Sequence, residues 1–319
     1  MMRAPSSPLP ATTGGLPLTH LLLACAVVAV WGTNFVVIHH GLRHFPPFLF
    51  AALRFLFAAI PAIFFLPRPA LPWRFTILYG LFIGVGQFGL LYIALTHGFA
   101  PGLASLVIQA QVFFTIALSI VLARERIRPT QVIALLLCLV GLGLIAARSE
   151  GASASLGLVL VLLAALSWAC GNQVARSAGK VPMLPFVVWS SLFAFPPLAA
   201  LSLVVEGPMR IGNSLVAATP AAWSALLWQS VGNTLFGYAA WAWLLSRHPA
   251  ALITPTALLV PVFGMSASAL LLREPMQAWK LTAAALVVAG LMINSLAPRF
   301  GRSSGPQDRH FESRNQDGG

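Results

Sequence analysis

Apolar stretches of about 20 residues recur along this chain from residue 18 to residue 298. As a helix, each stretch is long enough to cross a hydrocarbon core about 30 Å thick. Only 8% of the 319 residues are charged and 58% are hydrophobic, whereas roughly 25% of the residues of soluble domains are charged. A soluble globule of this composition would lack the polar surface to cover itself. The sequence therefore predicts an all-α polytopic membrane protein.

The apolar stretches, and the residues that separate them, predict ten membrane spans. Prolines stand at several predicted helix starts, where their missing N–H costs little, and glycines stand in several gaps. Because the connections are short, neighbouring spans should run antiparallel. The first stretch is predicted to be a retained helix, since no cleavage site of the A-x-A type follows a short apolar core. The predicted spans are 19–39, 46–66, 75–97, 102–123, 129–147, 155–175, 183–204, 222–245, 250–272 and 278–297, with tails at 1–18 and 298–319.

The positions of lysine and arginine predict how the chain is oriented in the membrane. With the N-terminus inside, 13 of the 19 lysines and arginines fall in predicted cytoplasmic segments, 5 fall in outer segments, and Arg54 lies within a span. This asymmetry favours cytoplasmic N- and C-termini. An odd number of spans would put the termini on opposite sides of the membrane and blur the asymmetry.

The net charge of +12 does not indicate a nucleic-acid partner, because the basic residues gather in loops beside the spans. No basic face with interleaved aromatic residues is present, so binding of nucleic acid is not expected. The three cysteines lie in apolar stretches and share no metal-ligand spacing. His40 and His44 have an i, i+4 spacing, but they lie in a proline-flanked loop. Neither a metal nor a cofactor is expected.

The chain contains an internal repeat. Residues 101–142 resemble residues 249–291: in each, an Arg-Glu pair closes one predicted helix, and a glycine 16 residues beyond the Glu lies in the next. The stretches 27–34 and 163–172 form a second match, each with a Trp followed by an Asn. Each predicted repeat, 19–147 and 155–297, holds five spans. Because five is odd, the second repeat enters the membrane from the opposite side.

Inverted repeats of this kind are related by a pseudo-two-fold axis in the membrane plane. Such a bundle has two near-equivalent conformations, one open to each side of the membrane, with a site near the midplane between the repeats. The arrangement suits alternating access and indicates a transporter.

The chain also resembles a known family. The start WGTNFVVI, the LRF of the second span and the two RE…G endings resemble EamA-type proteins of the drug/metabolite transporter superfamily. The stretches ASLVIQAQVFFT (104–115), SWACGN (167–172) and LLVPVFGMSASALLLREP (258–275) look similar to the O-acetylserine/cysteine exporter branch. The resemblance implies a secondary transporter of the bacterial inner membrane that exports small metabolites, amino acids and their derivatives among them. A monomer or a homodimer in the lipid bilayer is expected.

Arg54 stands near the middle of the second predicted span. A charged group at that depth costs at least a few kcal/mol, and all seven acidic residues lie in loops, at span ends or in the C-terminal tail. The guanidinium group either donates to backbone carbonyls and other neutral groups or binds a substrate carboxylate, which fits its planar fork. The sequence leaves both roles open.

Amide and aromatic side chains supply the other candidates for a substrate-binding chamber. Buried amides need partners, so they should face the bundle interior, where they either line a cavity or bond neighbouring helices. Gln109 and Gln111 lie about 200° apart around a helix, so only one of them can line a central chamber. With Arg54, the candidate substrate-binding residues are Trp31, Asn34, Gln87, Gln109, Trp168, Asn172, Asn233 and Tyr238.

Prolines and glycines inside the spans indicate where helices bend or touch. Pro61, Pro255 and Pro261 each remove a backbone hydrogen bond within a predicted span, which makes them candidate gating hinges or simple bends. Gly80 and Gly84 have the G-x-x-x-G spacing of close helix packing, with a cavity wall as the alternative.

Other functional classes remain as alternatives. No Walker-type loop indicates ATP use, and no catalytic constellation lies at depth, so an enzyme is not expected. Since no acid lies within a span, facilitated efflux and proton coupling through the substrate's own amine both stay open. A similar bundle could export another small metabolite or drug, or serve as a channel or a lipid-moving protein.

Overall fold

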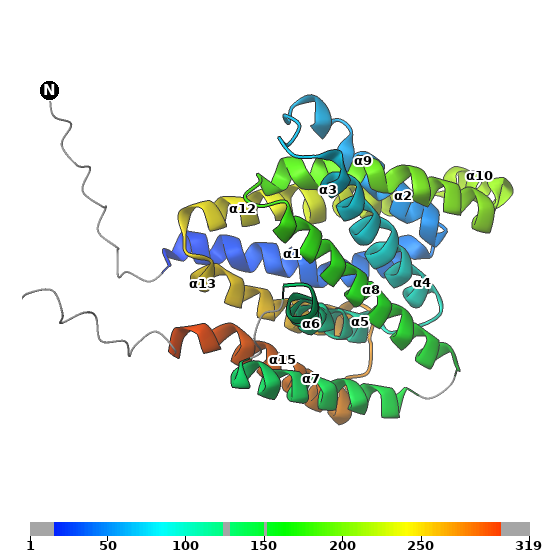
Figure 1. The fold of residues 1–319 in the computed structure, drawn as a ribbon. Coiled ribbons are helices and arrows are strands. Elements are labelled where there is room, and N and C mark those ends of the chain that lie inside the picture. Colours follow the sequence, from blue (N-terminus) through cyan, green and yellow to red (C-terminus); the bar gives the residue numbers. More distant parts are fainter. Residues whose placement is uncertain (1–15, 124–127, 150–151, 301–319) are drawn as a thin grey trace, which may run out of the picture.

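The structure, a computed structural model, describes residues 16–123, 128–149 and 152–300. The regular elements of these residues are all helical, and most of them run side by side as a bundle (Figure 1). In chain order the α-helices are α1 (Leu18–Leu42), α2 (Pro47–Ala59), α3 (Trp73–Gly80), α4 (Leu90–Thr96), α5 (Pro101–Val107), α6 (Gln111–Ala123), α7 (Pro129–Arg148), α8 (Ala152–Ser177), α9 (Met183–Leu201), α10 (Pro208–Ala217), α11 (Pro220–Leu227), α12 (Gly237–Arg247), α13 (Ala250–Ile253), α14 (Val260–Leu271) and α15 (Ala278–Phe300). Segments with tighter or wider winding continue several of them: η1 (Ala62–Phe64), η2 (Leu81–Gly89), η3 (Ile108–Ala110), η4 (Ser202–Glu206), η5 (Trp228–Phe236) and η6 (Thr254–Leu259).

Helical segments occupy all ten predicted spans. Within the described residues, nine helices are long and apolar enough to cross a membrane. The remaining predicted span runs from Pro220 to Arg247 through α11, η5 and α12, and polar residues such as Gln229 and Asn233 lower its mean hydropathy. α1 begins and α15 ends at the same end of the bundle (Figure 1), as an even number of crossings requires. The predicted all-helical membrane fold is confirmed.

The two repeats share the same departures from regular α-helix. The third span of each repeat winds more widely, in η2 and η5, and the fourth span winds more tightly, in η3 and η6. The wide segments also align in sequence, because residues 85–87 (VGQ) match residues 231–233 (VGN), and Tyr92 matches Tyr238. Wide turns of this type are frequent at functional sites.

Helices of one repeat pack mainly on helices of the other. α1 contacts α14 and the span formed by α11, η5 and α12, and in the other half α8 contacts α6 and the span formed by α3, η2 and α4. α2 lies against α9, and α7 lies antiparallel to α15 (Figure 1). Each contact in one half thus has a counterpart in the other, which is the pattern that inverted repeats produce.

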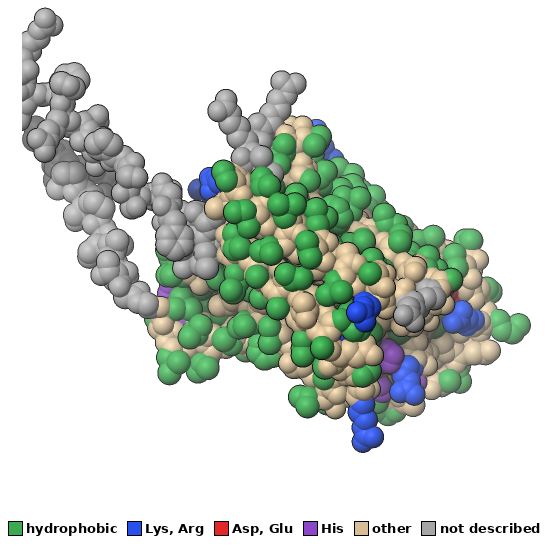
Figure 2. Space-filling view, turned by 90° about the horizontal axis from the view of Figure 1, so that it is seen from below, with side chains coloured by type: hydrophobic (Ala, Val, Ile, Leu, Met, Phe, Trp, Pro, Cys, Tyr) green, Lys and Arg blue, Asp and Glu red, His purple; other side chains and the backbone are tan. Residues whose placement is uncertain are grey.

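The α7–α15 pair lies at the edge of the bundle. Seen from the side that carries these helices, the surface is dominated by hydrophobic side chains (Figure 2). Leu136, Leu139 and Val140 of α7 are more than half exposed. An apolar surface of this kind suits contact with the lipid of the membrane that the chain crosses.

Glycines allow the helices to approach closely. A Cβ added at Gly80 would overlap the backbone oxygen of Ser190, and one at Gly84 would overlap the side chain of Ala194, both on α9. The predicted use of the G-x-x-x-G spacing in helix packing is confirmed. At the α7–α15 contact, a Cβ at Gly290 would lie 2.7 Å from the backbone oxygen of Ala134.

The three candidate hinge prolines lie where regular α-helix stops. α2 ends at Ala59, and Pro61 stands exposed just before η1. Pro255 lies in the tightly wound η6, and Pro261 is the buried second residue of α14. Their role in gating stays a prediction.

Gly290→Ala is expected to weaken the α7–α15 contact. The backbone oxygen of Ala134 cannot swing aside as a side chain can, so we expect a loss of about 1–3 kcal/mol in stability. Gly143→Ala on α7 is the matched control, because a Cβ there meets no atom of the described residues within 4 Å. Thermal unfolding in detergent measures both variants. Equal melting temperatures would contradict this packing.

The predicted orientation can be tested by labelling single cysteines in a variant without the three native ones. Lys180 follows α8 and Gln277 precedes α15, and both are exposed. With cytoplasmic termini, a membrane-impermeant maleimide added to intact spheroplasts should label Gln277→Cys. Lys180→Cys should react only after the membrane is opened. The reverse labelling pattern would show that the orientation predicted from the lysine and arginine positions is wrong.

Candidate functional site

Arg54 lies in the middle of α2 and is buried at the junction of the repeats, with 1% of its surface exposed. Nη1 donates to the hydroxyl of Tyr92 at 3.2 Å, and Nη2 donates to the hydroxyl of Thr234 at 3.3 Å. The guanidinium carbon lies 3.6 Å from the centre of the Phe88 ring. Nε is buried and has no hydrogen-bond partner among the residues that the structure describes. The positive charge therefore meets neutral groups, and its Nε donor is unused.

A chain of buried polar side chains leads from Arg54 to α1. The hydroxyl of Tyr92 donates to Oε1 of Gln229 at 3.1 Å. The side-chain amides of Gln229 and Asn34 exchange two hydrogen bonds, at 2.5 and 3.4 Å. Ser230 donates to the backbone oxygen of Arg54 at 3.0 Å. This polar network (Arg54, Tyr92, Gln229, Asn34, Thr234 and Ser230) joins α1, α2 and α4 of the first repeat to η5 of the second.

The two described acidic residues are engaged away from Arg54. Glu206 accepts hydrogen bonds from two backbone N–H groups at the start of α2, at 2.6 and 3.0 Å. Glu274 accepts one from an N–H group at the start of α5, at 3.0 Å, and pairs with Nζ of Lys280 at 2.9 Å. Carboxylates at helix starts satisfy free N–H groups and complement the helix dipole. Within the described part of the chain, no carboxylate bonds to Arg54.

Three predicted residues meet where α1 crosses the span formed by η5 and α12. Nε1 of Trp31 donates to the backbone oxygen of Asn233 at 3.1 Å. The ring centres of Trp31 and Tyr238 lie 5.8 Å apart, and those of Trp31 and Trp241 lie 5.2 Å apart. Gly237 permits this approach, since a Cβ there would overlap the indole nitrogen. We call the three half-buried rings of Trp31, Tyr238 and Trp241 the aromatic corner.

Four predicted residues lie apart from the polar network. Gln87 and Gln109 are buried, but none of the described hydrogen bonds joins their side chains to it. Asn172 donates to Gln111 at 2.8 Å and so bonds α8 to α6. Trp168 packs against two hydrophobic clusters. Their assignment to a substrate site stays a prediction.

Four residues of the polar network were not among the site residues predicted from the sequence: Tyr92, Gln229, Ser230 and Thr234. Tyr92 carried a usable signal, because it matches Tyr238 when the repeats are aligned at the VGQ and VGN stretches. Gln229 and Thr234 lie in the span of low mean hydropathy. That low hydropathy distinguishes the span from the others, but it does not reveal which side of the helix faces Arg54.

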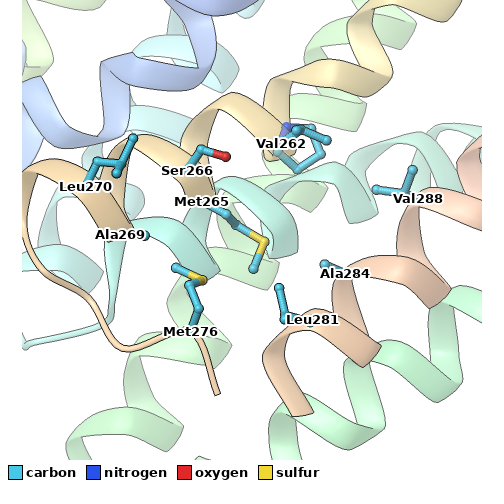
Figure 3. Close-up of a pocket in the computed structure, with 10 residues that line it drawn as sticks. Val262, Met265, Ser266, Ala269, Leu270, Met276, Leu281, Ala284 and Val288 are labelled. Carbon is cyan, nitrogen blue, oxygen red and sulfur yellow. The ribbon is translucent and has the colours of Figure 1, made fainter. Parts of the chain in front are cut away.

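An apolar groove of about 410 Å³ lies between α14 and α15 (Figure 3). Met265 of α14 extends into it toward Leu281 and Ala284 of α15, and Ser266 is the one hydroxyl-bearing side chain among its described lining residues. Such a lining cannot satisfy the charged groups of a polar metabolite. The groove suits contact with lipid, and the polar network remains the candidate site.

Gln229→Leu is expected to destabilise the protein. It removes the acceptor of the Tyr92 hydroxyl and the partner of Asn34, at roughly 1–3 kcal/mol for each buried polar group left unpaired. The double variant Asn34→Leu/Gln229→Leu leaves fewer buried polar groups without a hydrogen-bond partner. Its loss of stability should therefore be smaller than the sum of the losses in the two single variants. Unfolding in detergent compares the four proteins. Strictly additive losses would contradict the paired amides.

Comparison with known proteins shows the family. The model of the EamA-like transporter family matches residues 18–147 and 155–296. The "Probable amino-acid metabolite efflux pump" of Salmonella typhimurium is 42% identical over 288 residues, which cover 88% of this chain and 96% of that protein. The protein of the same name from Escherichia coli is 38% identical over 285 residues, covering 88% and 95%. A solved crystal structure with 21% identity covers 89% of this chain and 99% of its own, with a TM-score of 0.60, and supports the fold alone. The chain belongs to the EamA-like transporter family.

Proposed function

We propose that this protein exports small amino-acid-like metabolites, such as O-acetylserine, cysteine or related amino acids, across the bacterial inner membrane. It is a multi-pass membrane protein of a transporter family, and two of its relatives are named as probable amino-acid metabolite efflux pumps. The observation that carries the proposal is Arg54, a buried cation with an unused donor and no carboxylate partner in the described residues.

In this proposal the substrate carboxylate supplies the missing negative charge. The planar guanidinium fork accommodates a carboxylate through two parallel hydrogen bonds. The present contacts of the fork, at 3.2 Å to Tyr92 and 3.3 Å to Thr234, are long for a charged donor. A carboxylate can therefore displace these hydroxyls and gain shorter, stronger bonds. A substrate with no carboxylate leaves the cation unpaired.

The inverted repeats supply the means of transport. The polar network connects helices of both repeats, so a change in how the halves contact each other also changes the surroundings of Arg54. Rocking of one repeat against the other alternately opens the midplane site to each side of the membrane. A substrate that bonds to both halves stabilises the arrangement in which they close around it.

Arg54→Gln is expected to reduce the efflux of carboxylate-bearing amino acids from proteoliposomes by roughly 10- to 100-fold, the effect of losing a charged hydrogen-bonding partner. Arg54→Lys should retain part of the rate, because it keeps the charge but not the fork. The assay compares O-acetylserine, cysteine, an aromatic amino acid and a neutral amine.

Arg68→Gln is the control for this experiment. Arg68 is exposed and lies over the Trp73 ring, 3.7 Å from its centre, outside the polar network. Its loss should leave efflux unchanged. Full-rate export of amino acids by a correctly inserted Arg54→Gln variant would rule out a carboxylate site at Arg54.

A further inference from the structure

We infer that the aromatic corner of Trp31, Tyr238 and Trp241 binds the ammonium group of the substrate whose carboxylate binds Arg54. The inference rests on the proposed function and narrows it to one substrate class: zwitterionic α-amino acids with a free ammonium group. The corner would then select substrates that carry an ammonium group, while Arg54 would bind any substrate that carries a carboxylate.

A zwitterion brings a second charge that the site must receive. Removing an ammonium group from water costs several kcal/mol unless a partner replaces the water. Glu206 and Glu274 are bound at the starts of α2 and α5, so neither described acid is free to pair with it. The remaining partners are amide oxygens and the faces of aromatic rings, which attract cations through their quadrupoles.

The amide oxygens of the polar network already accept hydrogen bonds. Oδ1 of Asn34 accepts from Gln229, and Oε1 of Gln229 accepts from both Tyr92 and Asn34. The Phe88 face is likewise covered by the guanidinium group, at 3.6 Å. None of the described cation–π contacts uses the rings of the aromatic corner. These faces are therefore not occupied by any described cation.

The rings of the corner are inclined to one another in a way that suits one small cation. The planes of Trp31 and Tyr238 meet at 54°, and those of Trp31 and Trp241 meet at 51°. Inclined faces enclose an angle in which a cation can contact more than one ring. All three rings are half-buried, so part of each is sheltered from water while part stays open to a ligand.

The position of Trp31 is fixed before any ligand arrives. Its indole N–H donates to the backbone oxygen of Asn233, and its ring lies against the bare backbone of Gly237. An indole held in this way loses little conformational freedom when a ligand binds, which favours affinity.

Two links place the corner beside Arg54. Trp31 donates to the backbone oxygen of Asn233, and the hydroxyl of the next residue, Thr234, accepts from Nη2 of Arg54. Asn34, one helical turn from Trp31 on α1, is bonded to Gln229 of the polar network. In an α-amino acid a single carbon atom joins the carboxylate to the ammonium group, so their two subsites must adjoin.

The test uses three probes that differ in charge. O-acetylserine carries both groups, its isomer N-acetylserine carries only the carboxylate, and O-acetylethanolamine carries only the ammonium group. Proteoliposomes loaded with labelled O-acetylserine report efflux, and each unlabelled probe competes with it. Mildly acidic buffer slows the transfer of the acetyl group from oxygen to nitrogen.

Wild-type protein should bind O-acetylserine more tightly than N-acetylserine by roughly 2- to 30-fold, the strength of a cation–π contact. Trp31→Leu should remove most of this preference by weakening O-acetylserine alone, and Trp31→Phe should keep part of it. Equal weakening of both probes in Trp31→Leu, or no preference in the wild type, overturns the inference.

Trp189→Leu is the matched control. Its indole N–H also donates to a backbone oxygen, that of Leu66 at 3.2 Å, and its ring lies 6.0 Å from that of Trp73. This variant should keep the wild-type preference. Trp241→Leu should also weaken the binding of O-acetylserine alone. This second variant provides the test if a Trp31 variant fails to fold. Wild-type vesicles that release no labelled O-acetylserine contradict the proposed function, whereas unselective release contradicts the ammonium site alone.

Discussion

The structure depends on a positive charge buried in a membrane bundle without an opposite charge bonded to it in the described residues. Arg54 is held by two hydroxyl groups and an aromatic face, contributed by α4, η5 and η2. These contacts require both repeats to be in place, so the charge ties the two halves together. A cation at this depth costs several kcal/mol, and partners of this kind offset part of that cost while leaving the site able to attract an anion.

The inverted repeats explain the shape of the protein, and the differences between them explain its candidate site. When Pro46 is aligned with Pro182, Phe50 matches Phe186 and Arg54 matches Ser190. α2 and α9 pack on each other, but only α2 carries a charged residue at this matched position. A second arginine there would add like-charge repulsion in a medium of low dielectric constant. The two halves supply matching helices, and Arg54 gives the polar network a charge that the matching position of the second half lacks.

The sequence predicted the fold more completely than the site. The ten spans, the glycine contacts and the family follow from apolar length, residue spacing and repetition, which are local properties of the chain. Among the candidate residues, Arg54 and Asn34 enter one network, and Trp31, Asn233 and Tyr238 meet beside it. Gln87, Gln109, Trp168 and Asn172 lie apart from it, because apolar patterning in a membrane does not reveal how each helix is rotated about its axis.

What the sequence alone determined is that the chain crosses the membrane repeatedly, that it is doubled, and that one arginine stands at depth without a nearby acid. Only the tertiary structure decided which side chains surround that arginine. Asn34 and Gln229 are 195 positions apart, and Tyr92 and Gln229 are 137 apart. Contacts over such separations are set by how small residues let helices of opposite repeats approach and by which face each helix turns inward. Both are properties of the assembled bundle and of no single segment.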